Sequence, residues 1–233
     1  MAWFIFNGVD SRDKDVIVRR LPDLHRPKED ATYIKVPGRD GRLRQKSGSV
    51  DAYQTTLTVN CHGRTLAEIY DWLHGSGWMI SSNEPARRID IDLYAQGNDD
   101  RFRLASGACW DDVTFSVNAQ PYRDFVDDVS ETAAVSPAVL NNPGTAHCRP
   151  RFTIRGSGDV TVTVGLAQMD FAGLTDGVVV DCELMQCLSL DGSQLLNGLT
   201  TMDEYPTLAP GLNYLTFTGN VSEITVEMRC RDL

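Results

Sequence analysis

The chain has 233 residues, 42% of them hydrophobic and 23% charged, which is enough for one large or two ordinary globular domains with a buried core. No stretch approaches the roughly 18 consecutive apolar residues of a membrane-spanning helix, and the N-terminus lacks the features of a signal peptide. The formal net charge is −10 at pH 7, and the acidic second half of the chain disfavours tight binding to nucleic acid, because phosphate contacts need a basic surface. We therefore expect a protein that is made and kept in the cytoplasm and enters no membrane.

Charge is unevenly distributed along the chain. Residues 1–125 carry 17 Lys+Arg against 18 Asp+Glu, a net −1, whereas residues 126–233 carry 5 against 14, a net −9. Residues 126–147, where the change occurs, are first acidic and then small and polar with two prolines, which is typical of a linker or irregular crossing. The sequence therefore predicts an N-terminal domain over residues 1–130 and a C-terminal domain over residues 131–233.

The first elements are short apolar runs. Residues 3–6 predict a strand that ends in a turn at Asn7-Gly8, and Val16-Ile17-Val18 predicts a second strand.

The stretch from Tyr33 to Asn60 predicts a long two-stranded arm. An apolar run leads into a turn at Pro37–Gly41, where proline presets φ and the glycines can take positive φ. The chain then returns as a strand in which residues 53–59 alternate between two faces. The tip is basic, with Arg39, Arg42, Arg44 and Lys46 against a lone Asp40. An arm of this kind suits packing against another protein, and a mobile solvated loop is the alternative.

The arm supplies all the candidate interface residues, which are Pro37, Gly38, Arg39, Asp40, Gly41, Arg42 and Arg44.

One helix is predicted after the arm. Thr65 and Glu68 match a capping box, and Leu66, Ile69, Tyr70 and Leu73 form one apolar stripe. Gly75 ends the helix.

Strands resume after the helix. Residues 88–95 and 101–104 both alternate and are separated by a turn at residues 97–100, which predicts a hairpin with Leu93 opposite Leu104. Asp90 and Asp92 could form a catalytic carboxylate pair, but neighbouring arginines on a solvated face account for them fully. Residues 113–117 form another alternating strand.

Almost everything after residue 147 is strand and turn. Alternating segments at residues 151–154, 160–164, 178–184, 188–190, 212–217 and 224–228 are separated by Gly-, Pro- and Asp-containing turns. Short strands at this spacing predict an all-β sandwich.

No motif in the chain carries recognisable chemistry. There is no P-loop, no nucleophile elbow and no dinucleotide-binding fingerprint, and the six cysteines and four histidines form no metal-binding pattern. We therefore expect no catalytic residues, no metal, no cofactor and no enzymatic activity, and we expect the cysteines to be mostly buried and reduced. The four tryptophans, all in the first half, could stack on sugars, but core or interface positions are the commoner use.

Several turn-rich segments follow one another in a specific order along nearly the whole chain. They are F-x-F-N-G-V-D-S at residues 4–11, V-P-G-R-D-G at 36–41, W-L-H-G-S-G at 72–77, V-x-F and the following Pro-Tyr within 113–122, N-N-P-G-T at 141–145 followed by R-P-R-F-T-I-R-G, and P-x-L-x-P-G-L-N at 206–213. In their order and spacing these segments resemble the distal tail proteins of long-tailed, non-contractile bacteriophages.

This resemblance implies a mainly β chain with a tail-tube-like N-terminal domain and a galectin-like C-terminal β-sandwich. Six copies would form a ring at the distal end of the virion tail, joining the tail tube to the tip or baseplate, with the genome passing through the bore. The implied partners are the chain itself, the tail tube protein, the tape measure protein, and a tip, hub or tail-associated fibre protein. The virion tail would be assembled in the host cytoplasm.

Two other functions stay open at this point. A carbohydrate-binding protein of the host-recognition apparatus would use the sandwich directly, and would need an exposed aromatic such as Tyr205 or Tyr214 with polar side chains on one sheet face. A wall-degrading enzyme would need paired carboxylates in a cleft.

Overall fold

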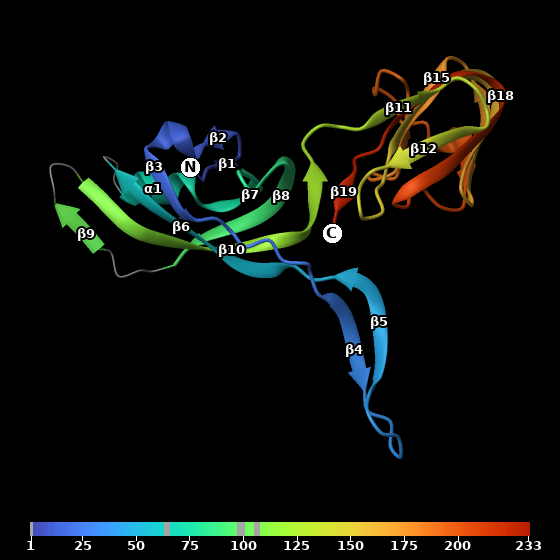
Figure 1. Ribbon diagram of the computed structural model, residues 1–233. Coiled ribbons are helices and arrows are strands. Elements are labelled where there is room, and N and C mark those ends of the chain that lie inside the picture. The colour runs from blue at the N-terminus through green and yellow to red at the C-terminus, as the bar shows by residue number, and fades with distance from the viewer. Residues whose placement is uncertain (1, 63–65, 97–100, 105–107) are drawn as a thin grey trace. The chain divides into compact units, whose positions relative to one another are not determined.

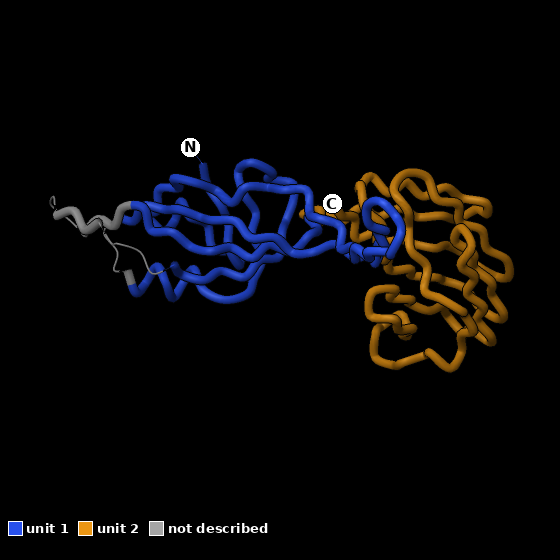
Figure 2. Tube along the Cα trace, turned by 90° about the horizontal axis from the view of Figure 1, so that it is seen from below, with its two compact units in different colours: residues 1–123, 233 blue, residues 124–232 orange. Residues whose placement is uncertain are grey.

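The computed structural model describes residues 2–62, 66–96, 101–104 and 108–233, and for residues 66, 101–104 and 108–111 it describes the backbone only. The described chain is mainly β, as predicted, and forms two compact units (Figures 1 and 2). Unit 1 comprises residues 1–123 with residue 233, and unit 2 comprises residues 124–232. No helix in the described ranges is both long and apolar enough to cross a membrane.

Unit 1 is built on one large sheet with the strand order β2-β1-β7-β8-β10-β6-β3, and β9 pairs with β10. Its elements are β1 (Phe4–Phe6), β2 (Val9–Asp10), the 3-10 helix η1 (Ser11–Lys14), β3 (Val16–Arg20), β4 (Glu29–Ile34), β5 (Leu43–Val50), β6 (Tyr53–His62), α1 (Leu66–Trp72), β7 (Gly75–Ser81), β8 (Glu84–Ala95), β9 (Arg101–Leu104) and β10 (Ala108–Phe125).

The predicted helix is α1, and its apolar stripe packs on the sheet. Ile69 and Leu73 are fully buried, Trp72 stacks on Phe4 with ring centroids 5.6 Å apart, and Tyr70 lies edge-on to Phe115. Gly75 has φ +78, a conformation that favours glycine and lets the chain leave the helix for β7. Thr65 of the predicted capping box lies outside the described residues.

The predicted long arm is two structures rather than one. β4 and β5 form a separate two-stranded sheet, whereas the alternating segment of residues 53–59 lies in β6 and pairs with β3 and β10 of the large sheet (Figure 1). The strand breaks at residues 51–52 because Leu57, Val59 and Cys61 bury one face of β6, while β5 is exposed on both faces. We call residues 29–50 the arm.

The predicted hairpin between residues 88–95 and 101–104 is wrong. β9 pairs with β10, which places Leu104 opposite Ala108, and Leu93 lies opposite Gly75 of β7. The edges of β8 are occupied by β7 and β10, so no edge is left there for β9. The turn predicted at residues 97–100 lies outside the described residues.

Unit 2 is one curled sheet with the path β11-β18-β13-β14-β17. Strand β12 adds beside β18, β15 adds beside β13, and β16 pairs with β15. Its elements are β11 (Ser130–Ala133), β12 (Ala138–Asn142), β13 (Arg151–Val164), β14 (Ala167–Leu174), β15 (Gly177–Asp181), β16 (Gln186–Leu188), the 3-10 helix η2 (Asn197–Leu199), β17 (Thr200–Met202), β18 (Gly211–Glu227) and β19 (Arg231–Asp232).

The two long strands β13 and β18 hold unit 2 together. Residues 151–155 of β13 pair with β15 and residues 158–164 pair with β14, with register shifts between these two parts. These irregularities let the sheet curl around a core that includes Phe152, Ile154 and Leu215. The two layers of the predicted sandwich are therefore parts of one hydrogen-bonded sheet.

Residues 126–147 are not the linker that their composition predicts. They contain β11 and β12, which pair with opposite ends of β18, and Ala133 and Leu140 enter the core of unit 2. Pro137 lies in the connection between these two short strands and follows a cis peptide bond, whereas Pro143 comes directly after β12.

Candidate interaction surface on the arm

The tip of the arm contains a hydrogen-bonded turn over residues 36–39. The Arg39 N–H donates to the Val36 carbonyl at 3.2 Å, with Pro37 and Gly38 at the two central positions. Gly38 has φ +77, which defines a type II turn, and Gly41 has φ +80. The positive φ expected at both glycines is therefore present, and a side chain with a Cβ would be strained at either position.

The arm exposes apolar side chains on both faces. Ile34 lies opposite Leu43, so their side chains share one face, and Tyr33 lies opposite Arg44 on the other. Val36, Ile34, Leu43 and Tyr33 are all exposed. Exposed apolar groups on a thin two-stranded sheet are typical of a surface that another chain covers.

One face of the arm holds an ion-pair cluster. Glu29 accepts from Arg44 Nη2 at 3.2 Å and lies 2.6 Å from Lys46 Nζ. The hydrogen bond from Lys46 and its charge lower the pKa of Glu29. Glu29 was not predicted as a partner of these cations, because it lies on the opposite strand and far from them along the chain. Arg44 and Lys46 thus share one carboxylate within the arm.

The base of the arm is tied by short polar contacts. Ser47 Oγ donates to the Asp30 carbonyl at 3.0 Å and lies 2.7 Å from Ser49 Oγ, and Gly48 between them has φ +84. The strand register shifts here, between Glu29 and Ala31, as expected for a bulge.

The charge left for a partner lies at the tip. The arm has five basic and three acidic residues, a net +2. Arg39 and Arg42 form no ion pair with any side chain in the described ranges, and both are exposed. These two guanidiniums and the four exposed apolar side chains can bind a surface that offers carboxylates beside apolar groups.

The structure corrects the explanation given for Asp90 and Asp92. Their cross-strand neighbours on β7 are Trp78 and Ser76 rather than arginines, and Ser76 Oγ donates to Asp92 Oδ1 at 2.5 Å. Both carboxylates line a shallow open groove with Trp78 and Gln120. Asp92 thus has a hydrogen-bond partner in Ser76, and the open groove lets solvent hydrate both carboxylates, as on any solvent-exposed sheet face.

Cysteine and metal chemistry give no site in the described part of the chain. No three His, Cys, Asp or Glu residues there gather closely enough to hold a metal ion. Cys61, Cys148, Cys182, Cys187 and Cys230 are buried and form no disulfide. Burial raises the pKa of Cys182 to about 12, which makes this thiol unreactive at neutral pH.

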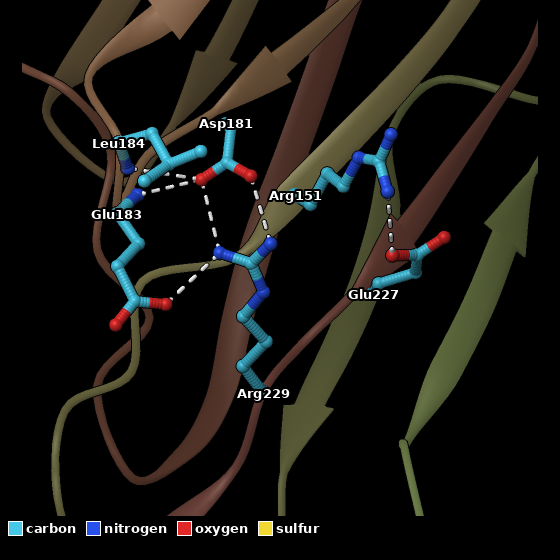
Figure 3. A network of polar contacts seen from close by, with 6 residues as sticks. All are labelled: Arg151, Asp181, Glu183, Leu184, Glu227 and Arg229. Atoms are coloured by element: carbon cyan, nitrogen blue, oxygen red, sulfur yellow. Dashed lines mark hydrogen bonds and ion pairs between the residues drawn. The ribbon is translucent and has the colours of Figure 1, made fainter. Parts of the chain in front are cut away.

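A buried charged network lies in unit 2, where β15 meets the end of β18 (Figure 3). Asp181, only 4% exposed, accepts from Arg229 at 2.9 and 2.7 Å and from the backbone N–H groups of Glu183 and Leu184 at 3.1 and 3.0 Å. Burial acts to raise the pKa of Asp181, but the hydrogen bonds from Arg229 and the backbone outweigh it, and the net pKa is lowered. The hydrogen bonds from Glu183 and Leu184 to Asp181 fix the turn after β15.

The outer face of unit 2 carries an exposed apolar patch that was not predicted from the sequence. Tyr214 of β18 lies opposite Val139 of β12. Leu212 precedes Tyr214 by two residues in the same strand and therefore lies on the same face. Leu166 lies in the adjacent turn, where the Gly165 N–H donates to the Tyr214 carbonyl at 3.1 Å. All four side chains are exposed, Leu166 completely. We call Val139, Leu166, Leu212 and Tyr214 the outer patch.

No family model matches this sequence, and no curated protein matches it. Among solved structures, the chain is similar to the crystal structure of the SPP1 Dit (gp 19.1) protein, which is described as a paradigm of the hub adsorption apparatus in phages that infect Gram-positive hosts. The two chains are 14% identical, the similarity covers 97% of this chain and 98% of that one, and the TM-score is 0.72. The chain therefore has the fold of the SPP1 Dit protein over almost its whole length.

Proposed function

We propose that the chain is a distal tail protein of a long-tailed, non-contractile phage. Six copies form a ring at the end of the tail, which joins the tail tube to the tip or baseplate and lets the genome pass. The observation that carries this proposal is the structural similarity to the SPP1 Dit protein, which extends over both units. Similarity in one domain alone would support a shared function much less, because single folds serve many functions. The order of the turn motifs in the sequence independently supports it.

In this proposal the protein is structural and has no catalytic role. Unit 1 supplies the ring contacts, and unit 2 is the galectin-like part. The chain itself, the tail tube protein, the tape measure protein and a tip or fibre protein are its partners in the virion tail, after assembly in the host cytoplasm. DNA passes through the bore without stable binding, which is compatible with the net charge of −10.

The arm contributes contacts between subunits or with the next tail component. These contacts are supported by the exposed guanidinium groups of Arg39 and Arg42, which form no ion pair with the described residues and lie beside exposed apolar side chains. Pro37, Gly38, Asp40 and Gly41 shape the tip, and Arg44 belongs to the contact surface through its ion pair with Glu29.

Electron microscopy of the purified chain tests the proposal. Wild-type protein should form annular particles with an open centre, and the variant Arg39→Ala/Arg42→Ala/Arg44→Ala should keep its fold but lose annuli. A matched control, Arg19→Ala/Arg20→Ala, removes exposed arginines of unit 1 outside the arm, where each forms a surface pair with an aspartate. Absence of annuli in wild type at every concentration would refute the ring, and normal annuli in the triple variant would refute the role of the arm.

A carbohydrate-binding protein is the second candidate, and one observation favours it. Tyr214 is 64% exposed on a sheet face that also presents Thr163, Thr216 and Thr218. Tyr205, the other aromatic that the sequence offered, packs instead against the core of unit 2. A glycan array separates the candidates, since a structural ring protein should give no specific signal.

A further inference from the structure

Unit 2 has an acidic groove directly beside its outer patch. Leu166, Gln168, Asp170, Asp203 and Glu204 line an open groove of about 480 Å³, so that Leu166 belongs to both the groove and the patch. Asp170 accepts from Thr161 Oγ1 at 2.7 Å and from Gln168 Nε2 at 2.8 Å, and these hydrogen bonds lower its pKa. The groove thus gathers three acidic side chains, those of Asp170, Asp203 and Glu204.

The groove lacks basic partners of its own. Neither Asp203 nor Glu204 forms an ion pair with the described residues, and residues 126–233 have a net charge of −9. The surface thus combines unpaired carboxylates with four exposed large apolar side chains. A partner that fits it must be cationic and apolar at once.

The arm has this complementary composition. It carries a net +2, its tip guanidiniums have no carboxylate partner among the described residues, and Tyr33, Ile34 and Leu43 are exposed on its two faces. We propose that the arm of one copy docks on the outer patch and acidic groove of a second copy, with Arg39 and Arg42 toward Asp203 and Glu204. This inference rests on the proposed ring and names the acceptor of the arm within it.

The arm and its acceptor are different surfaces of one chain. A contact between different surfaces of identical subunits is head-to-tail, and it closes into a ring when the rotation between subunits permits. The apolar groups exclude water from the contact, and the charges set its register and direction. Exposed charges are screened over about 8–10 Å at ordinary ionic strength, so assembly should weaken with salt.

Charge reversal in the full-length chain tests the docking. The arm variant Arg39→Glu/Arg42→Glu and the groove variant Asp203→Lys/Glu204→Lys should each need about ten-fold more protein to assemble, by sedimentation velocity over a concentration series. The chain that carries both the arm changes and the groove changes should regain assembly, because an acidic arm tip then faces a basic groove. The control Asp127→Lys/Asp128→Lys reverses two adjacent exposed acids of unit 2 elsewhere and should leave assembly unchanged.

The apolar part of the acceptor needs its own variant. Leu212→Ser/Tyr214→Ser should weaken assembly, whereas Leu184→Ser/Leu195→Ser, at similarly exposed leucines of unit 2, should not. Rings that form normally in the groove and patch variants would overturn this docking site and leave the proposed ring intact. A specific glycan-array signal that Leu212→Ser/Tyr214→Ser abolishes, with assembly unaffected, would assign the patch to a saccharide and also overturn it. A wild-type chain that stays monomeric would overturn both proposals.

Discussion

Replacing Arg229 with methionine should destabilise unit 2 by about 2–4 kcal/mol. The change leaves the Asp181 carboxylate, 4% exposed, without its cation. Removing one partner of a buried ion pair costs about 3–5 kcal/mol, and the 33% exposure of the Arg229 side chain reduces this. At about 4 °C per kcal/mol for a unit of roughly 100 residues, the melting temperature of unit 2 should fall by about 8–16 °C.

The loss should depend on pH in a defined direction. In the folded wild type the pKa of Asp181 is lowered, so its carboxylate contributes stability above its unfolded pKa, about 3.9, and loses it as the pH falls through the folded pKa. In the variant the same carboxylate is buried without a cation, which raises its pKa, and protonation relieves the penalty on acidification. The difference between wild type and variant should therefore be largest at pH 7 and smaller near pH 4.

Calorimetry at both pH values measures this difference. All four tryptophans lie at or before residue 110, so tryptophan fluorescence reports on unit 1 and should show no comparable shift. Arg155→Met is the matched control, because the partner Glu223 is an exposed surface acid at 3.1 Å and the pair is worth less than about 1 kcal/mol. If Arg229→Met costs no more than Arg155→Met at pH 7, or costs more at pH 4 than at pH 7, the reasoning about Asp181 is wrong.

Two further predictions concern buried positions in the two units. Gly177→Ala should cost several kcal/mol and sharply reduce soluble protein, because an added Cβ would lie 2.2 Å from the Ile154 carbonyl oxygen at φ +143; an unchanged melting temperature would contradict this. The five described cysteines should resist a thiol reagent at pH 8, since burial raises the pKa of Cys182 and Cys187, and a hydrogen bond with Cys230 together with burial raises that of Cys148. Rapid labelling of several of these five thiols before denaturant is added would count against the packing of the two cores.

Local patterns predicted the local structures well. The stripe of Ile69 and Leu73 gave the helix, and Pro37 with Gly38 and Gly41 gave the positive-φ tip, because these features depend on neighbouring residues only. Alternation along residues 53–59 likewise identified the buried face of β6.

Strand partners could not be predicted in the same way. Alternation shows which face of a strand is buried but not which edge is free, and the assignment of β9 to β8 failed for this reason. The composition of residues 126–147 gave no sign of β11 and β12. Both are short strands that pair with the long strand β18, and such strands need few apolar residues of their own.

The candidate surfaces show the same limit. The basic tip was visible in the sequence, whereas the ion pairs of Glu29 were not, since only strand pairing brings it to Arg44 and Lys46. The outer patch joins Val139, Leu166 and Tyr214, which lie far apart along the chain and meet through β12, β18 and the β13–β14 turn.

The mass of the purified chain in solution tests the central claim most directly. Native mass spectrometry at micromolar concentration and low salt should give a species of about 155 kDa, six copies of the 25.8 kDa chain. A single species at 25.8 kDa throughout the concentration series, or an oligomer of another closed number, would contradict a hexameric ring.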